Sequence, residues 1–357
     1  MSADQHSAAG IRKLLLRGLV LLLLLVIAGA VTTLGMYQRF QETTVRLPGP
    51  QLSYQLPAGA SLRQLAYDLQ RRGIIESPRF FVLLGRELDA ARRLQAGEYV
   101  LLQDMTPRSL LEMMMAGRVV QHELTLIEGE TFREMLQRIQ AHPVIEVTLD
   151  GLDDAAIMER LGHAGMHPEG RFLPDTYFFP RGTTDLAFLQ RAYAAMAQLL
   201  ASAWEQRADG LPFETPEQAL ILASIVEKET GRAEERPQIA GVFVRRLQQG
   251  MLLQTDPTVI YGMGDGFDGN LRLRDLRKDT PYNTYTRPGL PPTPIAMPGG
   301  AAIHAVLHPA AGDSLYFVSM GDGRHYFSST LKEHNLAVDK FQRGKQGISL
   351  PAEGNSK

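Results

Sequence analysis

The feature that most constrains this chain is an uncharged apolar run near its N-terminus. No charged side chain occurs between residues 18 and 37, and residues 19–27 are all Leu, Val or Ile. About 20 apolar residues in a helix cover the roughly 30 Å of hydrocarbon in a bilayer. Residues 18–37 are therefore predicted to be a transmembrane anchor. No second run of this length occurs, which argues against a multi-span transporter.

The charges beside this run predict its orientation. Arg12, Lys13 and Arg17 precede it, and by the positive-inside rule they keep residues 1–17 in the cytoplasm as a short tail. A cleaved signal peptide is the alternative, because Ala28-Gly29-Ala30 resembles a cleavage site. The uncharged run continues past Ala30, which favours an uncleaved anchor. Either interpretation exports the rest of the chain.

Composition excludes several classes of function. The 37 Lys and Arg residues nearly balance 39 Asp and Glu residues, so the net charge is −2 and gives no electrostatic basis for a nucleic-acid partner. Hydrophobic residues at 44% and charged residues at 21% indicate folded domains rather than a disordered chain. Cysteine is absent, which excludes disulfides, thiolate zinc sites and thiol catalysis.

Turn-forming residues and hydrophobic periodicity divide the exported part and predict an α+β fold. Residues 38–50 contain Pro48 and Pro50 and are interpreted as a linker. Residues 51–122 alternate short strands with small helices and are predicted to form a small domain. Residues 123–343 are predicted to form a larger mixed domain, and the polar residues 344–357 a flexible tail.

The most informative predicted helix begins near Thr215, a suitable N-cap, and ends in Glu227-Lys228-Glu229-Thr230. Glu227 and Glu229 are two positions apart and therefore point about 200° apart on a helix, so they do not share one pocket. Glu229 continues the apolar stripe of Leu222, Ile225 and Val226, where loss of solvation raises a carboxyl pKa and suits a general acid. From spacing alone, the simpler interpretation is a helix that ends in solvated charges.

The histidine spacing suggests a metal site, because His304 and His308 are four residues apart. His325 or His334 would supply the third ligand. A zincin would need glutamate where Ala305 stands. Structural histidines are favoured, and neither a metal nor a cofactor is predicted. The segments 254–262, 281–285 and 289–299 instead combine Tyr, Asn, Gln and Thr with prolines. Such side chains stack on and hydrogen-bond a carbohydrate, although an ordinary proline-rich loop has the same composition.

Several blocks of the sequence resemble a known family. The residues at 225–230, 253–261, 281–285 and 289–292, the Glu169-Gly170 block with residues 174–177, and a C-terminal block from Tyr316 to Asn335 resemble the endolytic murein transglycosylases (MltG/YceG-like). The resemblance runs from the anchor to about residue 340, in the family's order.

The resemblance implies an enzyme of the bacterial inner membrane whose catalytic domain is periplasmic. It would cut the bond between N-acetylmuramic acid and N-acetylglucosamine in nascent peptidoglycan strands without hydrolysis. The resemblance also implies that residues 51–122 are a LysM-like subdomain, and that a lysozyme-like helix in residues 123–343 carries the catalytic glutamate. Peptidoglycan synthases are the implied protein partners. The implied groove residues are Gln254, Asp256, Tyr261, Tyr282, Asn283 and Tyr285.

One acid is sufficient for the implied reaction. Glu229 would protonate the departing glycosidic oxygen and then accept the proton of the sugar's own 6-hydroxyl, which attacks C1 and leaves a 1,6-anhydro end. The pair Glu229-Thr230 fits the Glu-Ser pattern of lysozyme-like transglycosylases better than Glu227-Lys228 does. Glu227 is then a supporting or salt-bridging acid. The rival functions are a hydrolytic muramidase and a non-catalytic peptidoglycan-binding scaffold.

Overall fold

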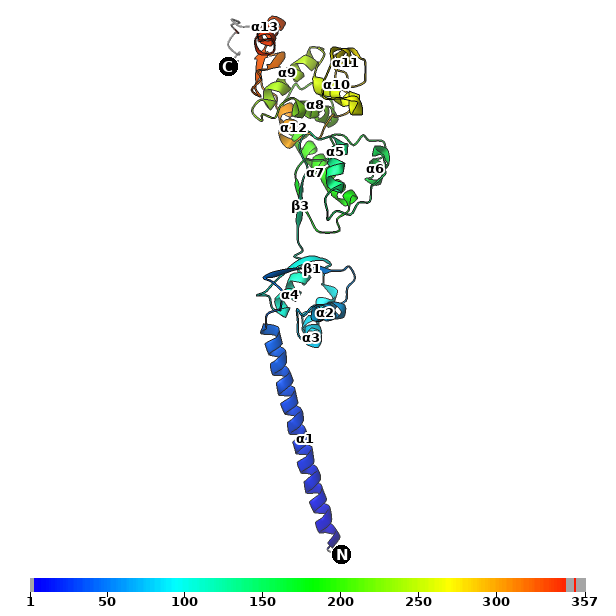
Figure 1. Ribbon diagram of the computed structural model, residues 1–357, viewed down its shortest axis with the longest axis vertical. Helices are drawn as coiled ribbons and strands as arrows, with labels where there is room; N and C mark the ends of the chain where they lie inside the picture. The colour runs from blue at the N-terminus through cyan, green and yellow to red at the C-terminus, as the bar shows by residue number, and fades with distance from the viewer. Residues whose placement is uncertain (1–2, 345–349, 351–357) are drawn as a thin grey trace. The chain divides into compact units, whose positions relative to one another are not determined.

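The computed structural model describes residues 3–344 and residue 350, with side chains from residue 13 onward. The chain divides into two compact units, Met1–His122 and Glu123–Lys357, and their α-helices are labelled in Figure 1. The predicted flexible tail falls, apart from residues 344 and 350, outside the described residues.

The N-terminal helix α1, Ala3–Glu42, contains the described part of the chain that is long and apolar enough to cross a membrane. That part, Lys13–Glu42, has a mean hydropathy of 2.8 in its best window. The helix continues five residues past the predicted end of the anchor, into the predicted linker. Tyr37 and Phe40 are buried against Phe80 there, so continuing the helix places two aromatic rings in a hydrophobic core.

The remainder of the predicted linker is also held in place. The Val45 N–H donates to the Met105 carbonyl at 2.8 Å, and the Arg46 N–H donates to the Ile74 carbonyl at 2.9 Å. Because both backbone groups are bonded to the first unit, α1 joins that unit without a free linker.

The first unit is a two-stranded antiparallel sheet packed with small helices. Strand β1 pairs with β2 in the register Gln51↔Leu102 to Leu56↔Gly97. Ser61 and Thr106 cap the following helices through capping boxes, as Ser and Thr do when they satisfy exposed helix N–H groups. Its elements after α1 are β1 (Gln51–Leu56), α2 (Leu62–Arg71), α3 (Pro78–Glu87), the 3-10 helix η1 (Ala90–Arg92), β2 (Gly97–Leu102) and α4 (Pro107–Met115).

The second unit is mainly helical, with two small sheets, so the described chain is a mixed helix and sheet protein. Strand β3 pairs with β4, and β5 pairs antiparallel with β6. Its elements are β3 (His122–Thr125, which begins at the unit boundary), α5 (Phe132–Gln140), α6 (Asp154–Arg160), β4 (Thr176–Phe179), α7 (Asp185–Glu205), α8 (Pro216–Glu229), α9 (Arg236–Gln248), α10 (Asp256–Met263), η2 (Gly264–Gly266), α11 (Leu273–Arg277), α12 (Gly300–Leu307), β5 (Tyr316–Ser319), β6 (His325–Ser328) and α13 (Leu331–Phe341).

Helix α8 is the centre of this unit and positions the acids. Thr215 caps it as predicted, with its hydroxyl accepting the Gln218 N–H. Every residue from 219 to 226 is buried, because α7, α9, α10 and α12 all contact the helix. The stripe of Leu222, Ile225 and Val226 that precedes Glu229 is thus buried, and so are the residues on the other side of the helix.

Candidate active site

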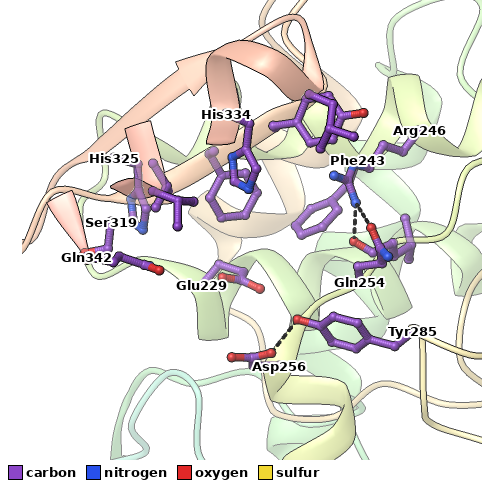
Figure 2. A pocket seen from close by; sticks show the side chains of 16 residues that line it. Glu229, Phe243, Arg246, Gln254, Asp256, Tyr285, Ser319, His325, His334 and Gln342 are labelled. Carbon is purple, nitrogen blue, oxygen red and sulfur yellow. Dashed lines mark hydrogen bonds between the residues drawn. The ribbon is translucent and has the colours of Figure 1, made fainter. Parts of the chain in front are cut away.

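A cavity of about 470 Å³ opens at the C-terminal end of α8. Side chains reach it from α8 and α9, from the loop before α10, from β5 and β6, and from α13 (Figure 2). Its polar lining includes Glu229, Arg246, Gln254, Asp256, Tyr285, His325 and His334.

Glu229 is the last residue of α8, and its carboxyl lines this cavity together with that of Asp256. The next residue, Thr230, is extended at φ −146° and ψ 135°, so the helix ends at Glu229. The Thr255 hydroxyl donates a hydrogen bond to Glu229 Oε1. Burial raises the pKa of Glu229 to about 7; the charge of Asp256 adds to the rise, while the Thr255 hydrogen bond and His325 oppose it.

Glu227 lies on the opposite side of the helix and outside the cavity. Its side chain is 5% exposed and forms a 2.9 Å ion pair with Arg236. The Gly299 N–H donates to its other carboxylate oxygen at 2.9 Å. Burial raises the pKa of Glu227, and the Gly299 hydrogen bond and Arg236 oppose that rise. Glu227 is thus enclosed by partners, whereas Glu229 forms no ion pair with any arginine or lysine of the described chain.

The loop before α10 holds the partner of Glu229. Gln254 has a left-handed φ of 53°, which turns the chain so that Thr255 reaches the carboxylate. The Thr284 hydroxyl accepts the Thr255 N–H at 3.1 Å, and the Thr284 carbonyl accepts the Gln254 N–H at 3.1 Å. Neither threonine was among the predicted site residues.

Three of the six predicted groove residues line the cavity with Glu229. The Tyr285 hydroxyl donates to Asp256 Oδ1 at 2.5 Å, and burial together with this bond raises the Tyr285 pKa. Gln254 Oε1 accepts from the buried guanidinium of Arg246 at 3.4 Å. Arg246 also donates to the Leu253 carbonyl at 2.9 Å, and so connects α9 to the cavity wall.

The other three predicted residues lie behind the cavity and support its loops. The Tyr261 hydroxyl donates to buried Glu169 at 3.0 Å, and the Tyr282 hydroxyl is 2.8 Å from that of Thr293. Asn283 is fully buried, and its amide donates to the Lys278 carbonyl at 2.7 Å. These contacts give the three side chains structural roles in this conformation, because their polar groups already have protein partners.

A histidine–carboxylate pair on the cavity wall was not predicted. His325 Nδ1 is 2.7 Å from Glu235 Oε2, and the His325 N–H donates to Glu235 Oε1 at 3.0 Å. The sequence identifies His325 as a possible third metal ligand and as part of the C-terminal family block, but not as the partner of Glu235. In the part of the chain that the structure describes, no three His, Asp or Glu residues are placed to hold a metal. His304 and His308 instead pack ring against ring at 4.5 Å.

Comparison with known proteins places the chain in a family. A model of the YceG-like family matches residues 54–340. The chain belongs to the YceG-like family. An endolytic murein transglycosylase of Bacillus subtilis is 29% identical over 325 residues, which cover 86% of this chain and 88% of that protein. The family resemblance drawn from the sequence blocks is thereby confirmed.

Two further proteins are similar to the chain, one of them over part of its length and the other a solved structure. An endolytic murein transglycosylase of Streptococcus pneumoniae is 32% identical over 184 residues, covering 50% of this chain and 33% of that protein. The chain thus spans about a third of this larger relative. The crystal structure of a yceG-like protein from Listeria monocytogenes is 30% identical, covers 80% of this chain and 98% of its own, and superposes with a TM-score of 0.49.

Proposed function

We propose that this YceG-like protein is a membrane-anchored endolytic lytic transglycosylase that cleaves peptidoglycan strands between N-acetylmuramic acid and N-acetylglucosamine. Its likeness to the Bacillus enzyme along most of both chains supports the reaction class. The observation that carries the proposal is Glu229: a carboxyl with a pKa raised to about 7, without a cationic partner in the described chain, at a cavity of about 470 Å³.

In the proposed reaction Glu229 acts first as an acid and then as a base. Its proton passes to the glycosidic oxygen as the C1–O bond breaks, and positive charge develops at C1. The resulting carboxylate accepts the proton of the 6-hydroxyl while that oxygen bonds to C1, which closes the 1,6-anhydro ring. Glu229 ends protonated and ready for another turn. A pKa near 7 suits this double role, because both protonation states are accessible at neutral pH.

Three further residues hold the sugar in the proposed reaction. Gln254, Asp256 and Tyr285 line the cavity with Glu229, and their amide, carboxylate and aromatic groups suit a carbohydrate. Glu227 is assigned a structural role, because Arg236 and Gly299 engage both of its carboxylate oxygens.

The proposal also places the protein in the cell. Residues 18–37 are assigned as the single transmembrane anchor of a bacterial inner-membrane protein, with residues 1–17 cytoplasmic, and with the rest of the first unit and the whole second unit periplasmic. Residues 51–122 are assigned as a LysM-like subdomain that holds glycan, where a second cavity of about 490 Å³ lies beside Tyr54 and α2. Peptidoglycan synthases are the proposed partners. Protease added to spheroplasts should digest both units and leave an N-terminal tag intact.

The decisive experiment compares two glutamine variants of the purified full chain on peptidoglycan sacculi. We expect Glu229→Gln to release no anhydro-ended fragments, while Glu227→Gln retains the reaction in proportion to its folded fraction. Mass spectrometry identifies the chemistry, because a hydrolytic muramidase gives fragments one water heavier. Circular dichroism establishes that each variant is folded.

Three results would contradict the proposal. Fragments with an added water would identify a muramidase. A sacculus digestion equal for the wild-type chain and Glu229→Gln would indicate a non-catalytic scaffold. Loss of activity only in a folded Glu227→Gln variant would move the acid to that position.

A further inference from the structure

The contacts between α1 and the rest of the first unit, residues 43–122, set the depth of that unit relative to the bilayer. Residues 18–38 are uncharged and are bracketed by Arg17 and Arg39. Twenty-one residues of helix span about 31 Å, the thickness of bilayer hydrocarbon. The C-terminal boundary of the hydrocarbon therefore lies near residue 38, and the lipid headgroups lie at the next turns of α1.

Helix α3 packs against α1 at this level. The Phe80 ring is 5.6 Å from that of Tyr37 and 5.8 Å from that of Phe40, centroid to centroid. The Arg108 guanidinium donates to Gln41 Oε1 at 2.7 Å, which ties α4 to the same turns. Because these contacts leave no free linker, the N-terminal part of α3 lies close to the headgroups whenever α1 spans the bilayer. Figure 1 shows α3 beside the C-terminal end of α1.

The outer face of α3 has the composition of a membrane-surface helix. At 100° per residue, Arg79, Leu83 and Arg86 fall within about 60° of arc, opposite the buried Phe81 and Leu84. All three are exposed, and Leu83 is 44% exposed. Neither guanidinium group has a hydrogen-bond or ion-pair partner within the described residues. The acid of this helix, Glu87, is also exposed; it lies about 40° from Leu83 and about 100° from Arg86, on the side of Phe80.

We propose that this outer face of α3, formed by Arg79, Leu83 and Arg86, docks on the anionic phospholipid surface of the membrane that α1 crosses. The two guanidinium groups would pair with lipid phosphates, and Leu83 would enter the interface between headgroups and acyl chains. The inference rests on the proposed membrane anchoring by α1. Its consequence is that lipid contact, in addition to the packing on α1, fixes the tilt of the first unit against the bilayer.

The absence of cysteine makes the test direct, because one introduced cysteine is the only labelling site. Full-length chains carrying Leu83→Cys, Val100→Cys or Ala28→Cys are labelled with a fluorophore and reconstituted into phosphatidylglycerol vesicles. Quenchers are placed on the lipid headgroups or in the acyl chains. Val100 on β2 is the matched control, since it is an apolar residue with a similar exposure of 37%, and Ala28 reports the depth of α1.

We expect headgroup quenching at residue 83 to be at least about twofold stronger than at residue 100, and to fall toward that control in neutral vesicles, at high salt, or with Arg79→Gln and Arg86→Gln together. Equal quenching at residues 83 and 100, with residue 28 deep, would overturn docking and leave the anchor intact. Residue 28 without acyl-chain quenching would overturn both. Strong quenching at residue 83 that ignores the arginines and lipid charge would overturn the recognition of anionic lipid.

Discussion

Replacing Glu229 by glutamine should stabilise the fold at high pH while it removes the proposed acid. Burial raises the Glu229 pKa from 4.5 to about 7, and each pKa unit corresponds to about 1.4 kcal/mol. An ionised Glu229 therefore lowers the free energy of unfolding by about 3 kcal/mol. This is an upper limit, since the side chain is partly exposed.

The sign depends on pH. Because the pKa is raised in the folded state, the folded chain retains a proton that the unfolded chain releases between pH 4.5 and 7. The wild type should lose stability across this window and remain lower above it, whereas Glu229→Gln has no such titration. The amide oxygen of the introduced glutamine still accepts the Thr255 hydrogen bond, so packing is preserved.

Unfolding of the full chain, followed by circular dichroism in detergent, measures the difference. At pH 8 we expect the melting temperature of Glu229→Gln to exceed that of the wild type by up to about 10 °C, at 2–4 °C per kcal/mol for a unit of this size. At pH 4.5 the two should nearly coincide. A variant that is less stable than the wild type at pH 8 would refute the assignment of Glu229 as a desolvated, unpaired carboxyl.

Glu227→Gln is the matched control, and we expect it to gain less stability at pH 8 than Glu229→Gln does. Burial raises the pKa of Glu227 as well, but the Gly299 hydrogen bond and Arg236 oppose that rise. The substitution also removes the charge that pairs with Arg236, whose side chain is 11% exposed, and a buried cation left with a weaker partner destabilises a fold by about 1–3 kcal/mol. Equal stabilisation by both variants would mean that general charge removal, rather than the burial of Glu229, explains the first result.

Three further outcomes are expected. The rate of anhydro-fragment release should fall about tenfold per pH unit above pH 7 as Glu229 loses its proton. It should show no decrease at acidic pH of the kind that a separate catalytic carboxylate would add. A bell-shaped pH–rate profile centred near pH 6 would contradict a mechanism in which one residue is both acid and base. Thr255→Val removes a hydrogen bond that lowers the Glu229 pKa, so this alkaline limb should move to higher pH, while Thr255→Ser should leave it in place. Asn283→Ala should lower the free energy of unfolding, measured by urea titration, by about 2–4 kcal/mol. The reason is that backbone carbonyls and the Tyr285 N–H lose a buried hydrogen-bond partner. An unchanged midpoint of unfolding would show that water replaces the side chain.

Helical geometry alone predicts correctly that the two acids point to opposite sides of α8. The angle of about 200° between residues 227 and 229 depends only on the helix repeat, and the structure places them on opposite sides of α8. The stripe of Leu222, Ile225 and Val226 is buried, but so is every residue from 219 to 226, so burial alone does not distinguish the two sides of α8. A central helix lacks the polar face that periodicity analysis uses.

Local chemistry determines the parts of this protein that can be predicted from the chain. The anchor follows from a continuous apolar run, and the starts of α2, α4 and α8 follow from Ser61, Thr106 and Thr215, because hydropathy and capping act within a few residues. The cavity has no such local cause. Thr255 reaches Glu229 across 26 positions, and Glu235 holds His325 across 90. The packing of α8, α9 and the β5–β6 sheet brings these groups together. Asn283, which the family resemblance implies as a groove residue, is fully buried within its loop.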